Sequence, residues 1–401
     1  MRITTPELFN RSLDGISTLQ QSIYRYQQMI SSGKRLTEPA DDPVAATQIM
    51  SIDERTAAID QYTRNSNLIS ERMDEQQNAI NSTMNSLQRI RDLMVATRNG
   101  SLTPADMKSN AAEVRQRLAE IVGLANTRNS SGEYLFAGSA VTTQPFSMDQ
   151  NLNASYYGNQ TTRDIGIAEG RTMTEGFPGS AVFQDIRNGN GTFVTGLGAA
   201  NTGTGRVVSD SVIDPAAYQA HDFSINFTAP NTYDVVDTST GTTVLAAQTY
   251  ADGAAITFNG ISVAITGTPA AGDTFTIAPS QNQSVFATIK NVVTTMESAP
   301  STDAQKAAWG FAMDQGLANI DQAMANLNTV RTSLAARQNA LDAQTQTNSD
   351  LKVQLSTMQS QLQDTDITST VSKLALQSNA LDAAQASFVR VQGLSLFKYL
   401  G

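Results

Sequence analysis

Hydrophobic residues near the two ends of the chain recur at intervals of three, four or seven positions. That spacing places side chains on one face of an α-helix, so it predicts a helix over residues 9–30 and another from Asp366 to the C-terminus. The apolar stripe of the first helix consists of Phe9, Leu13, Ile16, Ile23 and Ile30. The stripe of the last helix consists of Ile367, Val371, Leu374, Leu381, Phe388, Val391 and Leu396. Because neither stripe has a domain of its own to cover it, we expect these residues to pack on each other or on a neighbouring subunit.

A helical break separates the first helix from the next one. Asp42 followed by Pro43 is a typical pair of helix-capping residues, with Asp42 at the N-cap, so a long helix is expected to begin at Val44 and end near residue 99. Thr103 and Pro104 repeat this signal before a helix reaching about residue 129.

Helical spacing returns after residue 283. A short helix is expected before Pro300, and leucines and other apolar residues at positions 317–362 then follow a coiled-coil-like repeat. Arg331, Gln338 and Thr345 place polar side chains on this seam, which weakens it as a coil alone. We therefore expect it to pack against the helices of residues 44–129.

Between residues 135 and 284 the chain is rich in glycine, threonine, asparagine and β-branched residues, a composition typical of β-structure. The predicted strands are Arg206–Ile213, Asp222–Thr228, Thr232–Thr238, Ala255–Phe258, Ile261–Thr266 and Asp273–Ala278. Asn259-Gly260 lies between two alternating apolar runs and predicts a hairpin with a two-residue type I′ turn.

These patterns predict a multidomain α+β protein with nested organisation. Residues 1–40 and 366–401 would form a terminal domain in which the N- and C-terminal helices pair as a coiled coil. Residues 41–140 and 285–365 would form an inner helical bundle, and residues 141–284 an inserted, β-rich outer domain.

Composition excludes several classes of function. The 401 residues carry 27 basic and 37 acidic side chains, a net charge of -10, so neither nucleic acid nor an anionic membrane is an expected partner. There is no apolar run long enough for a transmembrane helix, and the first 15 residues lack the apolar core of a cleaved signal peptide. The absence of cysteine excludes disulfides, thiolate metal sites and cysteine nucleophiles.

The polar residues do not assemble into a catalytic motif. His221 is the one histidine, and we expect an exposed loop residue rather than a metal ligand or a base. Asp41 and Asp42 are adjacent carboxylates that could bind a metal, but helix capping explains them more simply, and Asp364 and Asp366 have the same explanation. We predict no enzymatic activity, no metal and no cofactor.

Several motifs, in order along the chain, resemble those of a known family. They are Ser32-Gly33-Lys34-Arg35-Leu36 followed by Pro39-Ala40-Asp41-Asp42-Pro43-Val44-Ala45-Ala46, then Ser131-Gly132-Glu133-Tyr134-Leu135-Phe136-Ala137-Gly138-Ser139, Gly260-Ile261-Ser262-Val263, Gly267-Thr268-Pro269, Gly272-Asp273-Thr274-Phe275 and Gly393-Leu394-Ser395-Leu396-Phe397. The ordered set resembles the flagellin-like proteins of bacterial flagella. The Asp-Asp-Pro-Val form is more similar to the hook–filament junction members of this family than to flagellin.

The resemblance implies a structural adaptor secreted to the extracellular flagellum, joining the hook zone to the flagellin filament. It implies type III export with a cytoplasmic chaperone, and contacts with copies of the same chain, with a neighbouring hook-associated protein on the hook side and with flagellin on the filament side. Alternatives are a flagellin-type filament subunit, a flagellin-like protein with a hydrolytic outer insert, and a cytosolic coiled-coil signalling adaptor. Burying each Leu, Ile or Phe of the terminal stripes contributes about 1.5–3 kcal/mol, against an ordering cost of about 1–2 kcal/mol per residue. We therefore expect terminal helices that fold on assembly.

Overall fold

The computed structural model describes residues 5–98, 103–298 and 300–397, with side chains described for residue 7 and for positions 9–390 within those ranges. The chain divides into two compact units. Unit 1 comprises Met1–Arg64 with Ala343–Gly401, and unit 2 comprises Asn65–Asp342. Two long helices, α2 (Pro43–Thr97) and α6 (Asp303–Gln363), contribute to both units.

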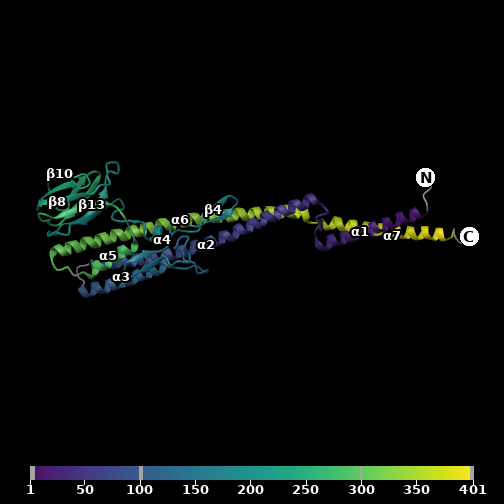
Figure 1. Cartoon of the computed structure of the whole chain (residues 1–401), viewed down its shortest axis with the longest axis horizontal. Helices are drawn as coiled ribbons and strands as arrows, with labels where there is room; N and C mark the ends of the chain where they lie inside the picture. The colour runs from purple at the N-terminus through teal and green to yellow at the C-terminus, as the bar shows by residue number, and fades with distance from the viewer. Residues whose placement is uncertain (1–4, 99–102, 299, 398–401) are drawn as a thin grey trace. The chain divides into compact units, whose positions relative to one another are not determined.

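Unit 1 is an assembly of helices from both ends of the chain. Helix α1 (Thr5–Ser32) lies alongside α7 (Ile367–Phe397), as Figure 1 shows. The start of α2 lies beside the end of α6, where Lys352 donates to Asp60 at 2.6 Å and Gln359 donates to Asp53 at 2.9 Å. Segments far apart in sequence therefore pair first-to-last, as the nested organisation predicts.

The helical part of unit 2 combines α2 and α6 with α3 (Pro104–Ala125) and α5 (Val285–Glu297). Helix α3 begins with a capping box, in which the side chains of Thr103 and Asp106 satisfy each other's backbone N–H groups. Apolar residues of all four helices, such as Met73 and Leu334, form one buried core.

Short elements of residues 146–187 belong to this same core. They are β1 (Phe146–Met148), β2 (Ala154–Tyr156), β3 (Asp164–Ala168), β4 (Arg171–Thr174), α4 (Gly179–Phe183) and β5 (Ile186–Arg187), which pairs with β14 (Asn282–Gln283). The fully buried rings of Phe146 and Phe183 pack against Phe286 of α5, with centroids 5.0 and 5.8 Å from it. The predicted β-rich domain of residues 141–284 is thus shared between two hydrophobic cores, because its first part supplies aromatic side chains that cover the helices.

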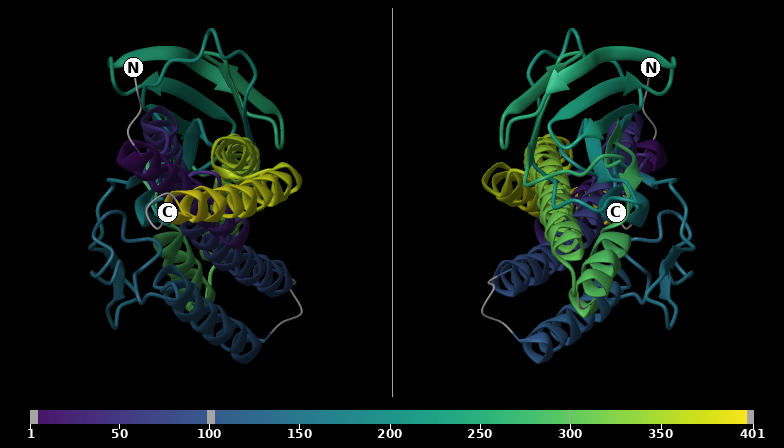
Figure 2. Two further views of the ribbon diagram at one scale, coloured as in Figure 1. Left: turned by 90° about the vertical axis from the view of Figure 1, so that its right-hand side faces the viewer. Right: turned by 90° about the vertical axis from the view of Figure 1, so that its left-hand side faces the viewer.

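The second core lies within the outer strands. They are β6 (Phe193–Leu197), β7 (Arg206–Val212), β8 (Phe223–Ala229), β9 (Thr232–Asp237), β10 (Thr242–Thr249), β11 (Ala255–Phe258), β12 (Ile261–Thr266) and β13 (Thr274–Pro279). One sheet has the order β10-β9-β8-β13-β6 and the other β11-β12-β7, all antiparallel. Figure 2 shows these strands as an arched layer. We call residues 193–279 the outer module; Phe311 of α6 also contributes to its core.

The predicted fold class is confirmed, with small shifts of element boundaries. Helix α2 begins at Pro43 rather than Val44, and α3 ends at Ala125 rather than near residue 129. The hairpin at Asn259-Gly260 is confirmed, since both residues have positive φ, 42° and 78°, between the antiparallel strands β11 and β12. The three-domain division stays a prediction. The boundary between the two compact units falls inside α2 and inside α6.

Candidate assembly site on the terminal helices

The contact between α1 and α7 brings the two predicted apolar stripes together. The ring of Phe9 lies 5.1 Å from the ring of Phe388. Lys34, just after α1, and Asp364, just before α7, form an antiparallel backbone bridge. The two helices are therefore antiparallel. Ile16 is seven residues after Phe9, and Leu381 is seven residues before Phe388, so equal helical rise places them opposite each other.

Burial follows the same face. Ile16, Ile23 and Ile30 of α1 are half-buried, as are Leu374, Leu381 and Phe388 of α7. Half-burial means that the pairing of α1 with α7 covers only part of each stripe.

The uncovered part of both stripes lies on one side of the α1–α7 pair. Leu13 precedes the half-buried Ile16 by three residues, and Val371 precedes Leu374 by three, and both Leu13 and Val371 are exposed. On antiparallel helices an equal angular offset from the contact face points to the same side of the pair. Tyr24, at 71% exposure, continues this side along α1.

We call this surface of the α1–α7 pair the apolar side. It consists of six exposed large hydrophobic residues, Phe9, Leu13, Tyr24, Ile367, Val371 and Val389. Exposed apolar patches of this kind are typical of protein interaction sites.

The junctions between helices tie the two ends of unit 1 to each other. Arg35 N–H donates to the carbonyl of Gln363 at 2.6 Å, and Thr365 N–H donates to that of Gly33 at 2.9 Å. The Arg35 guanidinium also donates to the carbonyl of Leu362 at 2.9 Å, which satisfies an end group of α6.

The carboxylates of this junction bind backbone N–H groups. Asp42 accepts from Ala45 N–H at 3.1 Å in the first turn of α2, where Pro43 is the first helical residue. Asp41 accepts from the N–H groups of Thr37 and Glu38, and these bonds hold the pKa of Asp41 below its ordinary value. The arrangement matches helix capping and loop closure.

The remaining predicted packing residues are placed as follows. Ile367 is exposed at the first position of α7, and the side chains of Val391 and Leu396 lie outside the described residues. Sequence reasoning missed Tyr24, although it lies eleven residues, about three turns, after Leu13. It also missed Leu376, which is 69% exposed and, five residues before Leu381, points away from the contact with α1.

His221 is not the exposed loop residue that the sequence suggests. It lies in a loop, but it is half-buried and its Nδ1 lies 2.7 Å from the carboxylate of Asp237. Asp237 also accepts from the N–H groups of Ser239 and Thr240, so the pair closes a turn of the outer module. Within residues 5–98, 103–298 and 300–397 no group of acidic, histidine or cysteine residues could hold a metal ion. In the same ranges, no helix is both apolar and long enough to cross a membrane.

Comparison with known proteins identifies the family. Residues 5–141 match the bacterial flagellin N-terminal helical region, and residues 197–279 match the D2-like domain of flagellar hook-associated protein 1. The structure of Xanthomonas campestris FlgL is 33% identical, with a TM-score of 0.72, covering 77% of this chain and 99% of that one. The flagellar junction protein FlgL from Legionella pneumophila is 30% identical, with a TM-score of 0.71, covering 79% and 99%.

A curated relative matches over nearly the whole chain. Flagellar hook-associated protein 3 of Escherichia coli is 23% identical over 399 residues, which is 99% of both chains. The match to residues 5–141 and the paired terminal helices define the class, a flagellin-like protein of bacterial flagella. Within that class, the chain belongs to the flagellar hook-associated protein 3 (FlgL) family.

Proposed function

We propose that this chain is a structural adaptor that joins the flagellar hook zone to the flagellin filament, and that it assembles through α1 and α7. The observation that carries the proposal is the apolar side of the α1–α7 pair, which leaves six large hydrophobic side chains exposed. Each such residue contributes about 1.5–3 kcal/mol of free energy when it is fully buried. An assembly that covers all six side chains is therefore stabilised by several such contributions together.

The partners follow from this role. One copy packs its terminal helices among those of other copies, with a neighbouring hook-associated protein on the hook side and flagellin on the filament side. A cytoplasmic chaperone would cover the same helices before type III export to the extracellular flagellum. The relatives of this family are named as hook-associated and junction proteins, which supports these contacts.

The proposed role requires no catalysis and no cofactor. Packing of apolar side chains explains the terminal helices, and helix capping explains the adjacent carboxylates Asp41 and Asp42. A metal analysis and a protease assay on the purified chain check this part of the proposal, and a bound metal or hydrolytic activity would contradict it.

Electron microscopy of flagella from a strain lacking the chain tests the proposal. We expect hooks without filaments, and filament subunits released into the medium, with both defects repaired by the intact chain. Filaments of normal length in the deletion strain would contradict the adaptor role. Copy number separates this role from that of a filament subunit, since an adaptor forms a short zone and a filament subunit is present in thousands of copies.

A further inference from the structure

Asparagine precedes glycine at residues 99, 188, 190 and 259. In such a pair the backbone nitrogen of the glycine can attack the side-chain amide carbon of the asparagine, since glycine carries no Cβ to block the approach. The attack requires an asparagine side chain that is free to turn and a glycine N–H that no hydrogen bond holds. The pair at 99–100 lies outside the described residues, and the other pairs belong to unit 2.

The pair Asn188-Gly189 is held at both groups. The side-chain oxygen of Asn188 accepts from the Gln281 N–H at 2.9 Å and from the Ser280 hydroxyl at 3.2 Å. The Gly189 N–H donates to the side chain of Asn319 at 2.8 Å. These bonds must break before the glycine nitrogen and the amide carbon can meet.

The pair Asn190-Gly191 is held in the same way. The side-chain oxygen of Asn190 accepts from the N–H groups of Thr192 and Phe193, at 3.0 and 2.9 Å. The Gly191 N–H donates to the carbonyl of Asn188 at 3.2 Å. The fold therefore protects this pair as well.

The pair Asn259-Gly260 differs at both groups. Among the residues that the structure describes, neither the Asn259 side chain nor the Gly260 N–H has a hydrogen-bond partner. The type I′ turn leaves this N–H unused, because the pairing of β11 with β12 begins at the residues on either side, Phe258 and Ile261. No hydrogen bond within the described chain thus opposes the approach of the two reacting groups.

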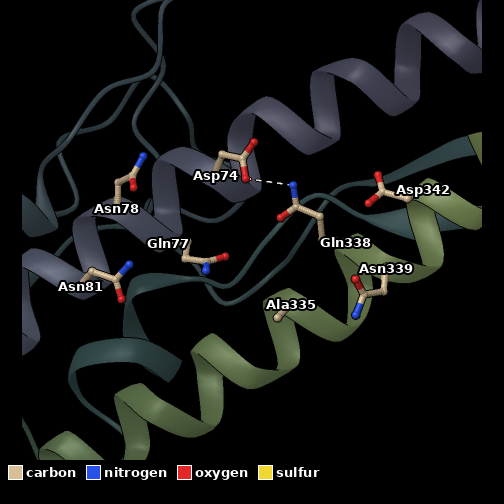
Figure 3. Close-up of a pocket in the computed structure, with 8 residues that line it drawn as sticks. All are labelled: Asp74, Gln77, Asn78, Asn81, Ala335, Gln338, Asn339 and Asp342. Carbon is tan, nitrogen blue, oxygen red and sulfur yellow. Dashed lines mark hydrogen bonds between the residues drawn. The ribbon is translucent and has the colours of Figure 1, made fainter.

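An exposed asparagine side chain does not by itself produce this combination. Asn78 and Asn339 are exposed and line the polar groove between α2 and α6 that Figure 3 shows. Ala79 and Ala340 follow them, so a methyl group crowds each nitrogen. Both N–H groups also lie inside helices, where they bond to the carbonyl four residues earlier.

We propose that Asn259 is a site of spontaneous deamidation and isoaspartate formation at the turn between β11 and β12. The Gly260 nitrogen gives its proton to water and bonds to Cγ of Asn259. The bond from Cγ to Nδ2 then breaks, and the leaving nitrogen takes a proton from water and departs as ammonia. Water opens the resulting cyclic imide, so the net reaction is hydrolysis of the side-chain amide. Opening at Cγ gives aspartate, and opening at the backbone carbonyl carbon gives isoaspartate, in which the main chain runs through Cγ.

The isoaspartate product does not fit this turn. It lengthens the main chain at Gly260, where an added Cβ would already lie 2.3 Å from the carbonyl oxygen of Asp214. The carbonyl of Gly260 also accepts from the N–H groups of Ile213 and Asp214, at 2.8 and 3.0 Å. A longer turn displaces these contacts, so we expect the outer module to lose stability as isoaspartate accumulates. The inference does not depend on the adaptor role.

Peptide mapping by mass spectrometry tests the site on the purified full chain, incubated in neutral buffer. Digestion in heavy-oxygen water marks any modification that arises during handling. We expect deamidation at Asn259 to be roughly tenfold faster than at Asn188 and Asn190, where hydrogen bonds must break first. Labelling by an isoaspartate-specific methyltransferase should fall in the peptide that contains Asn259. Equal or slower deamidation at Asn259, or no isoaspartate there, would overturn the proposal.

Unfolding in concentrated urea separates the effect of the fold from that of local sequence. All of these pairs then lose their hydrogen bonds, so we expect their rates to converge. A difference that persists in urea would show that neighbouring residues set the rates, and it would overturn the structural argument.

The variant Asn319→Ala is a matched test within the folded chain. It removes the acceptor of the Gly189 N–H and leaves the turn at Asn259 untouched. We expect deamidation at Asn188 to increase severalfold while the rate at Asn259 stays the same, with a thermal melt to verify that the variant is folded. An unchanged rate at Asn188 would contradict the protection assigned to this hydrogen bond.

Asn259→Asp is the control for the effect of the product. Asp-Gly also favours the type I′ turn, so N259D carries the added charge without a longer main chain. We expect the isoaspartate fraction of an aged sample, separated by chromatography, to melt at a lower temperature than N259D. Equal melting temperatures would overturn the expected loss of stability.

Discussion

The ring of Phe9 in α1 packs against the ring of Phe388 in α7, with centroids 5.1 Å apart and planes tilted by 40°. This contact joins residues near opposite ends of the chain and sets the antiparallel register of the two helices. In that register Ile16 lies opposite Leu381, and both are half-buried. The pair thus forms a narrow apolar seam with a second, uncovered apolar side next to it.

Replacing Leu381 with Asp should abolish assembly. A carboxylate at this half-buried position would be desolvated in the seam between α1 and α7. The stripe of α1 that faces it is apolar and contains no basic residue to neutralise the charge. The chain retained in purified flagella is the measurement, and thermal unfolding of the outer module should be unchanged. The control Ser372→Asp places the same charge on an exposed position of α7 and should assemble. Normal filaments carrying L381D would contradict the role of the seam.

How far sequence predicts the structure depends on the kind of signal. The β11–β12 hairpin could be predicted because Asn259-Gly260 demands positive φ at two positions, a purely local requirement. Strand β10 could not, since it is an edge strand with an irregular register and a positive φ at Ala247, and its side chains do not alternate between buried and exposed. Strands β1–β5 are two to five residues long, too short for a periodic signal.

The assembly site on α1 and α7 also combines features that local sequence predicts with features that it does not. Helical spacing predicts the seam residues because burial on one helix face is periodic. It does not predict which flank of a stripe stays uncovered, since that depends on the register of two helices more than 300 positions apart in the chain. The ion pairs of the buried Arg72 in α2 with Glu133 and Glu175 were missed for the same reason, because their partners are not neighbours in sequence.

Glu175 should be essential for the stability of unit 2. Its buried carboxylate accepts from Arg163 at 2.5 Å and lies 3.7 Å from the buried guanidinium of Arg72. Glu175→Gln removes a charge that both guanidinium groups require, so we expect a loss of about 2–3 kcal/mol in the free energy of unfolding, measured in urea.

Lys306→Ala is the matched control for Glu175→Gln. Lys306 pairs with Asp303 at 3.0 Å, but both side chains are largely exposed, so its loss should cost less than about 0.5 kcal/mol. Equal effects of the two substitutions would contradict the role assigned to the buried network.

Unit 2 should lose stability in acid through Glu133. Burial raises the pKa of this carboxyl group, but hydrogen bonds and charges from Arg163 and Arg72 outweigh burial and leave the pKa below the ordinary value of 4.5. The unfolded chain then binds the proton more readily than the folded one. The stabilisation is present above about pH 4.5 and is lost as the pH falls through the lowered pKa. Urea midpoints measured between about pH 6 and pH 3 should decline less steeply for Glu133→Gln than for the parent chain, and equal slopes would count against this assignment.

Gly260→Ala should destabilise the outer module without preventing assembly. Its φ is 78°, and an added Cβ would lie 2.3 Å from the carbonyl oxygen of Asp214. We expect a loss of more than about 1 kcal/mol, measured by thermal unfolding. Gly241→Ala is the control, because Gly241 has a similar φ of 74° with open space around it, so only the backbone cost applies. An equal effect at both positions would show that the contact with Asp214 is unimportant.

Hydrogen exchange compared between the free chain and assembled flagella is the most direct measurement. Residues 5–30 and 370–390 should exchange rapidly in the free chain and become strongly protected in the assembly, while the outer module keeps its protection in both. Slow exchange of these terminal residues in the free chain, or the same protection before and after assembly, would contradict the conclusion that they fold and pack among neighbouring subunits.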